Sequence, residues 1–197
     1  MKINFLLFFI PYILHVITTY YQINRAQDNK LIDINPLRDI IHDHSINLSD
    51  LKYKNLDSLF VIFLLPFLQK GSFDALIYFF KILSIIVLIR TISSSITDMP
   101  SSNPNCKYHT DFNSIYSYTL GHCFDKIFSG HTATTLLLIL CANQFNLISD
   151  SNFIYWIFIH IIYVYIGLIC TRHHYSVDVF ISYIITPLIY NSIKNYI

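Results

Sequence analysis

Six apolar runs separated by polar connections restrict what this chain can fold into. In order, they are Ile3–Tyr21, Leu56–Leu68, Phe73–Ile92, Thr132–Ile148, Phe153–Thr171 and Ser176–Ile193. Most approach the twenty or so residues that an α-helix needs to cross a bilayer core of about 30 Å. The second run is the shortest and the weakest candidate. The pattern predicts an all-α membrane protein: a bundle of six transmembrane helices forming a single domain over residues 1–197.

Charge and cysteine usage narrow the expected partners. The charged residues, 13% of the chain, gather between the apolar runs, and the net charge of +1 gives no basic surface for nucleic acid. The four cysteines lack the spacing of a zinc site, so we expect neither metal nor cofactor. Cys106 and Cys123 share one polar connection and either pair or remain thiols. The first run lacks a small-residue cleavage site and is interpreted as a span, not a signal peptide.

The lengths of the connections predict which ones emerge together. If all six runs cross the membrane, the connections 22–55, 93–131 and 172–175 lie on one face. This parity places His131 and His174 on the same face, although they are distant in sequence. Lys and Arg are more numerous on this face than on the opposite one, which by the positive-inside rule indicates a cytosolic orientation.

The sequence Ser129-Gly130-His131 leads directly into the fourth apolar run. Ser129 can cap the helix, Gly130 allows close approach of a ligand, and the N–H groups of the first turn can hold a phosphate. The plain alternative is a capped helix start with an interfacial histidine.

His174 and Asp178 stand four residues apart at the start of the sixth run. On a helix this spacing places the carboxylate within reach of the imidazole. An Asp that holds one ring nitrogen leaves the other as a nucleophile or base. The alternative is an interfacial ion pair.

The two histidine segments together indicate phosphoryl transfer. In this hypothesis His174 attacks phosphorus, and His131 protonates the leaving alkoxide. Arg90 is the first candidate to clamp the phosphate and Arg172 the second, although Arg90 could instead snorkel to the interface. We assign Tyr175, next to His174, to substrate binding, together with Ser129 and Gly130.

Two motifs resemble a known family. C-x-D-x-x-F-S-G-H-T at Cys123–Thr132 and H-Y-S-V-D-V at His174–Val179 resemble the sphingomyelin synthase and inositol-phosphorylceramide synthase family, within the type 2 phosphatidic acid phosphatase superfamily. Leu88–Cys106 is more loosely similar to the family's Leu-Arg-x-x-Thr…Thr-x-Leu-Pro-x-Pro region, and Pro36–Asp39 to its Pro-Leu-Pro-Asp element. The resemblance covers about residues 36–193.

The resemblance implies six spans and a metal-independent triad of His131, His174 and Asp178. It also implies a lumenal or exoplasmic active face, in the Golgi, endoplasmic reticulum or plasma membrane. This orientation conflicts with the count of Lys and Arg, and we follow the resemblance because Asp residues are mixed among those charges.

The resemblance favours transfer of a phospho-head-group over removal of phosphate. The Ser-Arg-x5-His signature of the superfamily's phosphatases is absent, since Leu168 stands six residues before His174. We therefore expect a glycerophospholipid donor, a ceramide acceptor, diacylglycerol as the by-product and a phospho-histidine intermediate. The alternatives are a lipid phosphatase or phospholipase C that uses water, and an inactive membrane scaffold. The head group and the oligomeric state, including a homo-oligomer, are left open.

Overall fold

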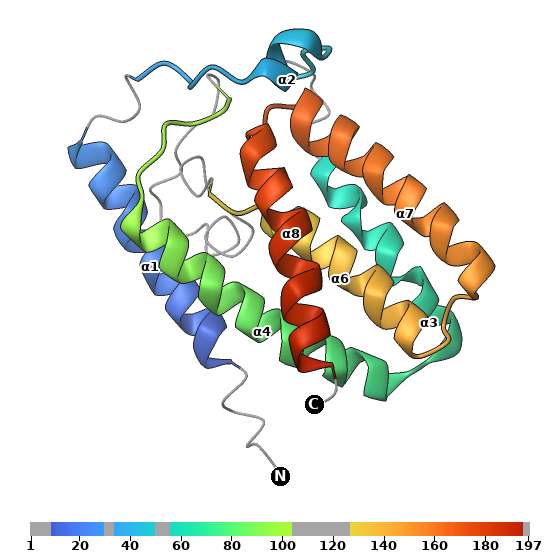
Figure 1. The fold of residues 1–197 in the computed structure, drawn as a ribbon. Coiled ribbons are helices and arrows are strands. Elements are labelled where there is room, and N and C mark those ends of the chain that lie inside the picture. The colour runs from blue at the N-terminus through green and yellow to red at the C-terminus, as the bar shows by residue number, and fades with distance from the viewer. Residues whose placement is uncertain (1–8, 30–33, 50–55, 104–126, 195–197) are drawn as a thin grey trace.

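The computed structural model describes residues 9–29, 34–49, 56–103 and 127–194, and all regular structure within these ranges is helical (Figure 1). The elements are α1 (Ile10–Asp28), α2 (Ile40–His44), the 3₁₀-helix η3 (Leu56–Leu64), α3 (Leu65–Lys70), α4 (Phe73–Ile96), α6 (Gly130–Gln144), α7 (Asp150–Val164), the π-helix η5 (Tyr165–Cys170) and α8 (Ser176–Ile193).

Helix α6 lies at the centre of the bundle and packs against α4, α7, α8 and η3 (Figure 1). The core is built from side chains of these elements; Ile82, Leu137, Leu138 and Leu168 are at most 1% exposed. Helix α1 packs on the outer side of α4. The first turns of α6 and α8 therefore lie near each other at one end of the bundle.

Three segments are long and apolar enough to cross a membrane: Phe73–Ile96, Asp150–Cys170 and Ser176–Ile193. They fit a membrane protein, and the expectation of an all-helical fold is confirmed for the described residues. The predicted count of six spans is not confirmed by these three segments.

The first apolar run continues as helix beyond its predicted end at Tyr21. Helix α1 extends to Asp28, while residues 3–8 of the predicted run lie outside the described residues. The buried ring of His15 contacts Thr91 of α4, with 3.2 Å between Nδ1 and Oγ1. Near its C-terminal end, Arg25 pairs with Asp98 at 2.5 Å. Arg25 also donates through Nη1 to the carbonyl of Ser95 in α4 at 2.9 Å, so polar contacts stabilise α1 beyond the end of the apolar pattern.

The short second run is accounted for by an unusual helix. Leu56–Leu64 is a 3₁₀-helix of nine residues, followed by six residues of α-helix that end at Lys70. A 3₁₀-helix rises about 2.0 Å per residue instead of 1.5 Å, so the pair extends about 27 Å. Gly71 closes it with a φ of 59°, in the left-handed region that suits glycine.

The bounds of the remaining runs agree with prediction to different degrees. The sixth run, Ser176–Ile193, is confirmed at both ends. Helix α4 continues four residues beyond the predicted Ile92, and α6 ends at Gln144 instead of Ile148 because the chain turns at Asn146, whose φ is 53°. The fifth run is an α-helix that continues as a π-helix to Cys170.

Candidate active site

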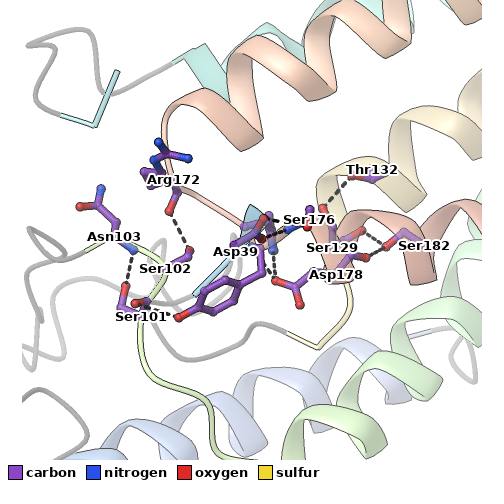
Figure 2. A network of polar contacts seen from close by, with 12 residues as sticks. Asp39, Ser101, Ser102, Asn103, Ser129, Thr132, Arg172, Ser176, Asp178 and Ser182 are labelled. Carbon is purple, nitrogen blue, oxygen red and sulfur yellow. Dashed lines mark hydrogen bonds and ion pairs between the residues drawn. The ribbon is translucent and has the colours of Figure 1, made fainter. Parts of the chain in front are cut away.

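The three connections predicted to share one face contact one another. Ser102 donates through Oγ to the carbonyl oxygen of Arg172 at 2.7 Å (Figure 2). The hydroxyl of Tyr175 accepts from the amide of Leu37 at 3.0 Å and donates to the carbonyl of Pro100 at 3.2 Å. The described parts of these connections therefore lie together, while the six crossings from which parity placed them on one membrane face stay a prediction.

His131 and His174 lie side by side at this end of the bundle. Their ring centroids are 6.2 Å apart with an interplanar angle of 63°, close enough for both rings to contact one phosphate group. His131 comes from the first turn of α6, and His174 from the turn before α8. The ring of Phe60, in η3, also lies edge-on to His131 at 6.3 Å.

His174 and Asp178 form a buried pair. Nδ1 of His174 lies 3.3 Å from Oδ2 of Asp178, and their side chains are 5% and 0% exposed. The same oxygen accepts the amide of Tyr175 at 3.0 Å (Figure 2). A carboxylate at Nδ1 favours the tautomer with its proton there, so Nε2 carries the nucleophilic lone pair.

Ser129 caps α6, as the sequence predicts. Its Oγ accepts the amide of Thr132 at 3.2 Å, and its own amide donates to the carbonyl of Asp178 at 3.3 Å. Ser182 donates through Oγ to the carbonyls of Ser129 and Asp178 at 3.0 and 2.8 Å (Figure 2). These bonds fix the start of α6 against α8. A contact between Ser129 and substrate stays a prediction.

Arg90 reaches the start of α6 across the face of Gly130. A Cβ atom at Gly130 would overlap Nη1 of Arg90 and lie 2.8 Å from its Cζ. Arg90 is 8% exposed, so its guanidinium is held inside the protein and does not snorkel outward. Because Gly130 has no side chain, the guanidinium of Arg90 can lie against the backbone next to His131.

Arg172 and Tyr175 have their side chains tied to the segment around α2. Arg172, which has a φ of 60°, donates through Nη1 to Oγ of Ser45 at 3.0 Å and through Nη2 to the carbonyl of His42 at 2.7 Å. The ring of Tyr175 stacks on His42, with centroids 6.0 Å apart. Their predicted contacts with substrate are not tested by this geometry.

Asp39 and His42 adjoin the predicted site, and reasoning from the residues gave neither of them a role. Asp39 accepts from the amide and hydroxyl of Ser176, and His42 contacts the carbonyl of His174 at 3.0 Å. The one available signal was the similarity of Pro36–Asp39 to a family element. Their partners stand more than a hundred residues along the chain, beyond the reach of local patterns.

Because the pKa of His42 is lowered in the folded protein, we expect the contact between α2 and the turn that carries His174 to weaken in acid. Burial of the ring lowers this pKa most. The Asp39 carboxylate opposes that effect, Arg172 lowers the pKa further, and the His174 carbonyl and Asp43 raise it by less. Docking is therefore at full strength above about pH 6.5, where unfolded His is neutral, and is lost as the pH falls through the lower folded pKa. Thermal unfolding in detergent from pH 7 to 5 should show wild type losing stability relative to His42→Gln, which does not titrate. Parallel pH dependence in the two proteins would contradict this.

A second buried network lies beneath His131. The Tyr183 hydroxyl donates to Nδ1 of His160 at 3.1 Å, His160 Nε2 donates to Thr135 Oγ1 at 2.8 Å, and Thr135 donates to the carbonyl of His131 at 2.7 Å. This order of donors assigns the proton of neutral His160 to Nε2. His160 is 0% exposed and is therefore a packed histidine of the protein interior.

Thr135→Val is expected to lower the free energy of unfolding by about 1–3 kcal/mol, because it removes the 2.8 Å acceptor of His160 inside the core. The shape of the side chain is kept, so packing changes little. Thermal unfolding in detergent measures the effect, with Thr134→Val, half-buried on the same helix, as the matched control. Equal losses at both positions would contradict the network's contribution.

The described cysteines lie in the protein interior as free thiols, and no metal site is found among the described residues. Cys141 and Cys170 are buried thiols, whereas Cys106 and Cys123 lie outside the described residues, so their pairing stays a prediction. Within the described ranges, no group of three or more His, Cys, Asp or Glu side chains is arranged to hold a metal ion.

A protein-family model described as PAP2 superfamily C-terminal matches residues 122–196. The match includes α6, α7, η5 and α8, and with them His131, His174 and Asp178. It supports the type 2 phosphatidic acid phosphatase superfamily and, with it, a membrane enzyme that acts on phospholipids. It does not distinguish sphingolipid synthases from other members. No curated protein and no solved structure matches the chain.

Proposed function

We propose that this protein transfers a phospho-head-group (phosphocholine, phosphoinositol or phosphoethanolamine) from a glycerophospholipid to ceramide. The observation that carries the proposal is the pair of adjacent histidines, of which His174 is held by buried Asp178. A nucleophile oriented by a carboxylate, with a second imidazole beside it, is suited to two successive displacements at phosphorus.

In the first displacement, Nε2 of His174 attacks the donor phosphorus, and the bond from phosphorus to the diacylglycerol oxygen breaks. Protonated His131 gives its proton to that oxygen, and diacylglycerol leaves. In the second, the ceramide hydroxyl attacks the phospho-histidine while His131 takes its proton, and the bond from phosphorus to nitrogen breaks. Both imidazoles return to their starting states, as a ping-pong cycle requires.

Positive charge at the phosphate comes from Arg90 and from the N-terminus of α6. The guanidinium at Gly130 lies next to the first helical turn, where backbone dipoles favour an anion. An arginine fork can bind two phosphate oxygens and oppose the charge that develops on them. No metal or cofactor has a part in the proposed cycle.

Gly130→Ala is expected to lower turnover at least tenfold, because the added methyl group displaces the Arg90 guanidinium. Arg90→Ala should cause a similar loss by removing the same group. In a double-mutant cycle of turnover numbers, the two losses should therefore not add. Additive losses would show that Gly130 acts independently of Arg90.

Lipid hydroxyl is favoured over water as the acceptor by two features. Leu168 is fully buried at the position of the phosphatase arginine, and its carbonyl accepts the amides of His173 and His174 at 2.9 and 3.3 Å. His174 itself is 4% exposed. Exclusion of water protects a reactive phospho-histidine from hydrolysis.

We further propose six spans, with α1, η3–α3 and α6 crossing beside the three long apolar segments. The 27 Å reach of η3–α3, which approaches the thickness of a bilayer core of about 30 Å, supports this count. The histidines then face the lumen or the exterior, in the Golgi, endoplasmic reticulum or plasma membrane. Both substrates, the glycerophospholipid donor and the ceramide acceptor, reach the site from that membrane.

Purified protein in mixed micelles should convert phosphatidylcholine, phosphatidylinositol or phosphatidylethanolamine carrying a labelled head group to labelled sphingolipid only when ceramide is present. If the main product is free labelled phospho-head-group or phosphate, with or without ceramide, the protein is a hydrolase and the proposed transfer is wrong. Lipid binding with no turnover of any donor would leave an inactive scaffold as the explanation and overturn the proposal.

A further inference from the structure

The segment 37–48, here termed the α2 clasp, lies against the turn that carries His174 (Figure 1). Backbone groups at both ends of the clasp make part of this contact. The amide of Leu37 donates to the Tyr175 hydroxyl at 3.0 Å, and the amide of Leu48 donates to the carbonyl of Cys170 at 2.8 Å. The clasp is thus attached before and after His174.

Asp39 joins the clasp to the first residue of α8. One carboxylate oxygen, Oδ2, accepts the amide of Ser176 at 2.6 Å. The other, Oδ1, accepts the Ser176 hydroxyl at 2.9 Å together with the amides of Ile41 and His42 at 3.0 and 3.2 Å. Burial alone would raise the pKa of Asp39, but these hydrogen bonds lower it below its usual value, so the group is a carboxylate at neutral pH.

His42 acts on the other side of the same turn. Its Nε2 lies 3.0 Å from the carbonyl oxygen of His174, and only the Nε2–H tautomer or the protonated ring can donate there. Stacking against Tyr175 holds the ring in place. The clasp therefore binds the carbonyl of His174 and the amide of Ser176, whereas Asp178 binds the ring.

We propose that Asp39 and His42 are positioning residues that fix the backbone of His174 for attack on phosphorus; this rests on the proposed function. The carboxylate of Asp178 can orient the imidazole of His174 only if the backbone of His174 is already held in position. A displacement of about 1 Å costs about a hundredfold in rate when attack requires close alignment. Loss of the clasp should therefore lower kcat and leave KM nearly unchanged.

Asp39→Asn is the first test, since an amide group cannot accept at both oxygen positions. Its kcat for head-group transfer should fall about ten- to a hundredfold, with KM within about twofold of wild type. Asp43→Asn is the matched control: Asp43 lies on α2, the helix that Asp39 caps, and its exposed carboxylate pairs with Arg38 at 3.1 Å. Wild-type kcat in Asp39→Asn, or an equal loss in the control, would overturn the role of Asp39.

His42→Gln and His42→Ala separate positioning from simple loss of structure. Glutamine can place an N–H near the position of Nε2, so it should restore most of the kcat that alanine loses. Equal loss in both variants would contradict positioning through the His174 carbonyl.

A readout without turnover keeps the test independent of the proposed reaction. The rate at which diethyl pyrocarbonate modifies His174, followed by peptide mass spectrometry, should rise in Asp39→Asn and His42→Ala but not in Asp43→Asn. Unchanged rates would overturn the inference. Changed rates in a protein that transfers no head group would support it and refute the function instead.

Discussion

Asp178→Asn is expected to lower the turnover number of head-group transfer by about 10³–10⁴-fold, the scale seen when the carboxylate is removed from a catalytic His–Asp pair. The amide carries no charge to stabilise the cationic imidazole in the transition state. Its N–H group can also bond to the ring nitrogen and hold the wrong tautomer. Oδ2 of Asp178 contacts Nδ1 of His174 and accepts the amide of Tyr175, so the substitution acts on the nucleophile. We therefore expect kcat to fall more than the affinity for the donor lipid.

Asp74→Asn provides the control for this substitution, since Asp74 is exposed in the first turn of α4, at the opposite end of that helix from Arg90. Its turnover should equal that of wild type. Asp178→Asn must still fold, which thermal unfolding in detergent verifies. A folded Asp178→Asn protein that keeps more than a tenth of wild-type turnover would rule out the proposed role of Asp178.

The loss of turnover caused by His131→Ala is expected to depend on the leaving group of the donor. With a phospholipid donor, loss of the general acid should cost about 10²–10⁴-fold in turnover, since the departing alkoxide is a strong base. With p-nitrophenyl phosphocholine, whose leaving group needs no proton, formation of the phospho-enzyme should be almost unaffected. His174→Ala should abolish reaction with both donors, because it removes the nucleophile.

The comparison of donors distinguishes an acid from a residue that merely binds phosphate. If His131 only bound phosphate, both donors would suffer equally. His44→Ala, an exposed histidine of α2 on the same face, should leave both rates unchanged. Equal losses for the two donors in His131→Ala would contradict the proposed division of roles.

The sequence was sufficient to bring the two histidines together. Because apolar runs of nearly span length must alternate direction, parity alone put His131 and His174 on one face, and the rings lie 6.2 Å apart. The cap at Ser129 was also predictable, since capping is a local property. Close approach at Gly130 was predicted for a ligand, whereas the structure places the Arg90 guanidinium there. The bounds of α8 followed from the apolar pattern for the same reason.

Contacts between distant segments lay outside that reasoning. Arg172 turns toward α2 because its backbone adopts a positive φ, which composition does not predict for arginine. Asp39 looks like an ordinary helix cap until Ser176 meets its carboxylate. The 3₁₀ form of Leu56–Leu64 was equally hidden, since an apolar run does not distinguish it from an α-helix.

A covalent intermediate on His174 can be trapped directly if His174 carries the head group between lipids, as we propose. Purified protein should be mixed with phosphatidylcholine labelled in its phosphate, quenched in alkali without ceramide, and analysed by peptide mass spectrometry. We expect an alkali-stable, acid-labile phosphocholine on His174 that disappears when ceramide is added before the quench. Label on another residue, or transfer to ceramide with no labelled enzyme at any time, would contradict it.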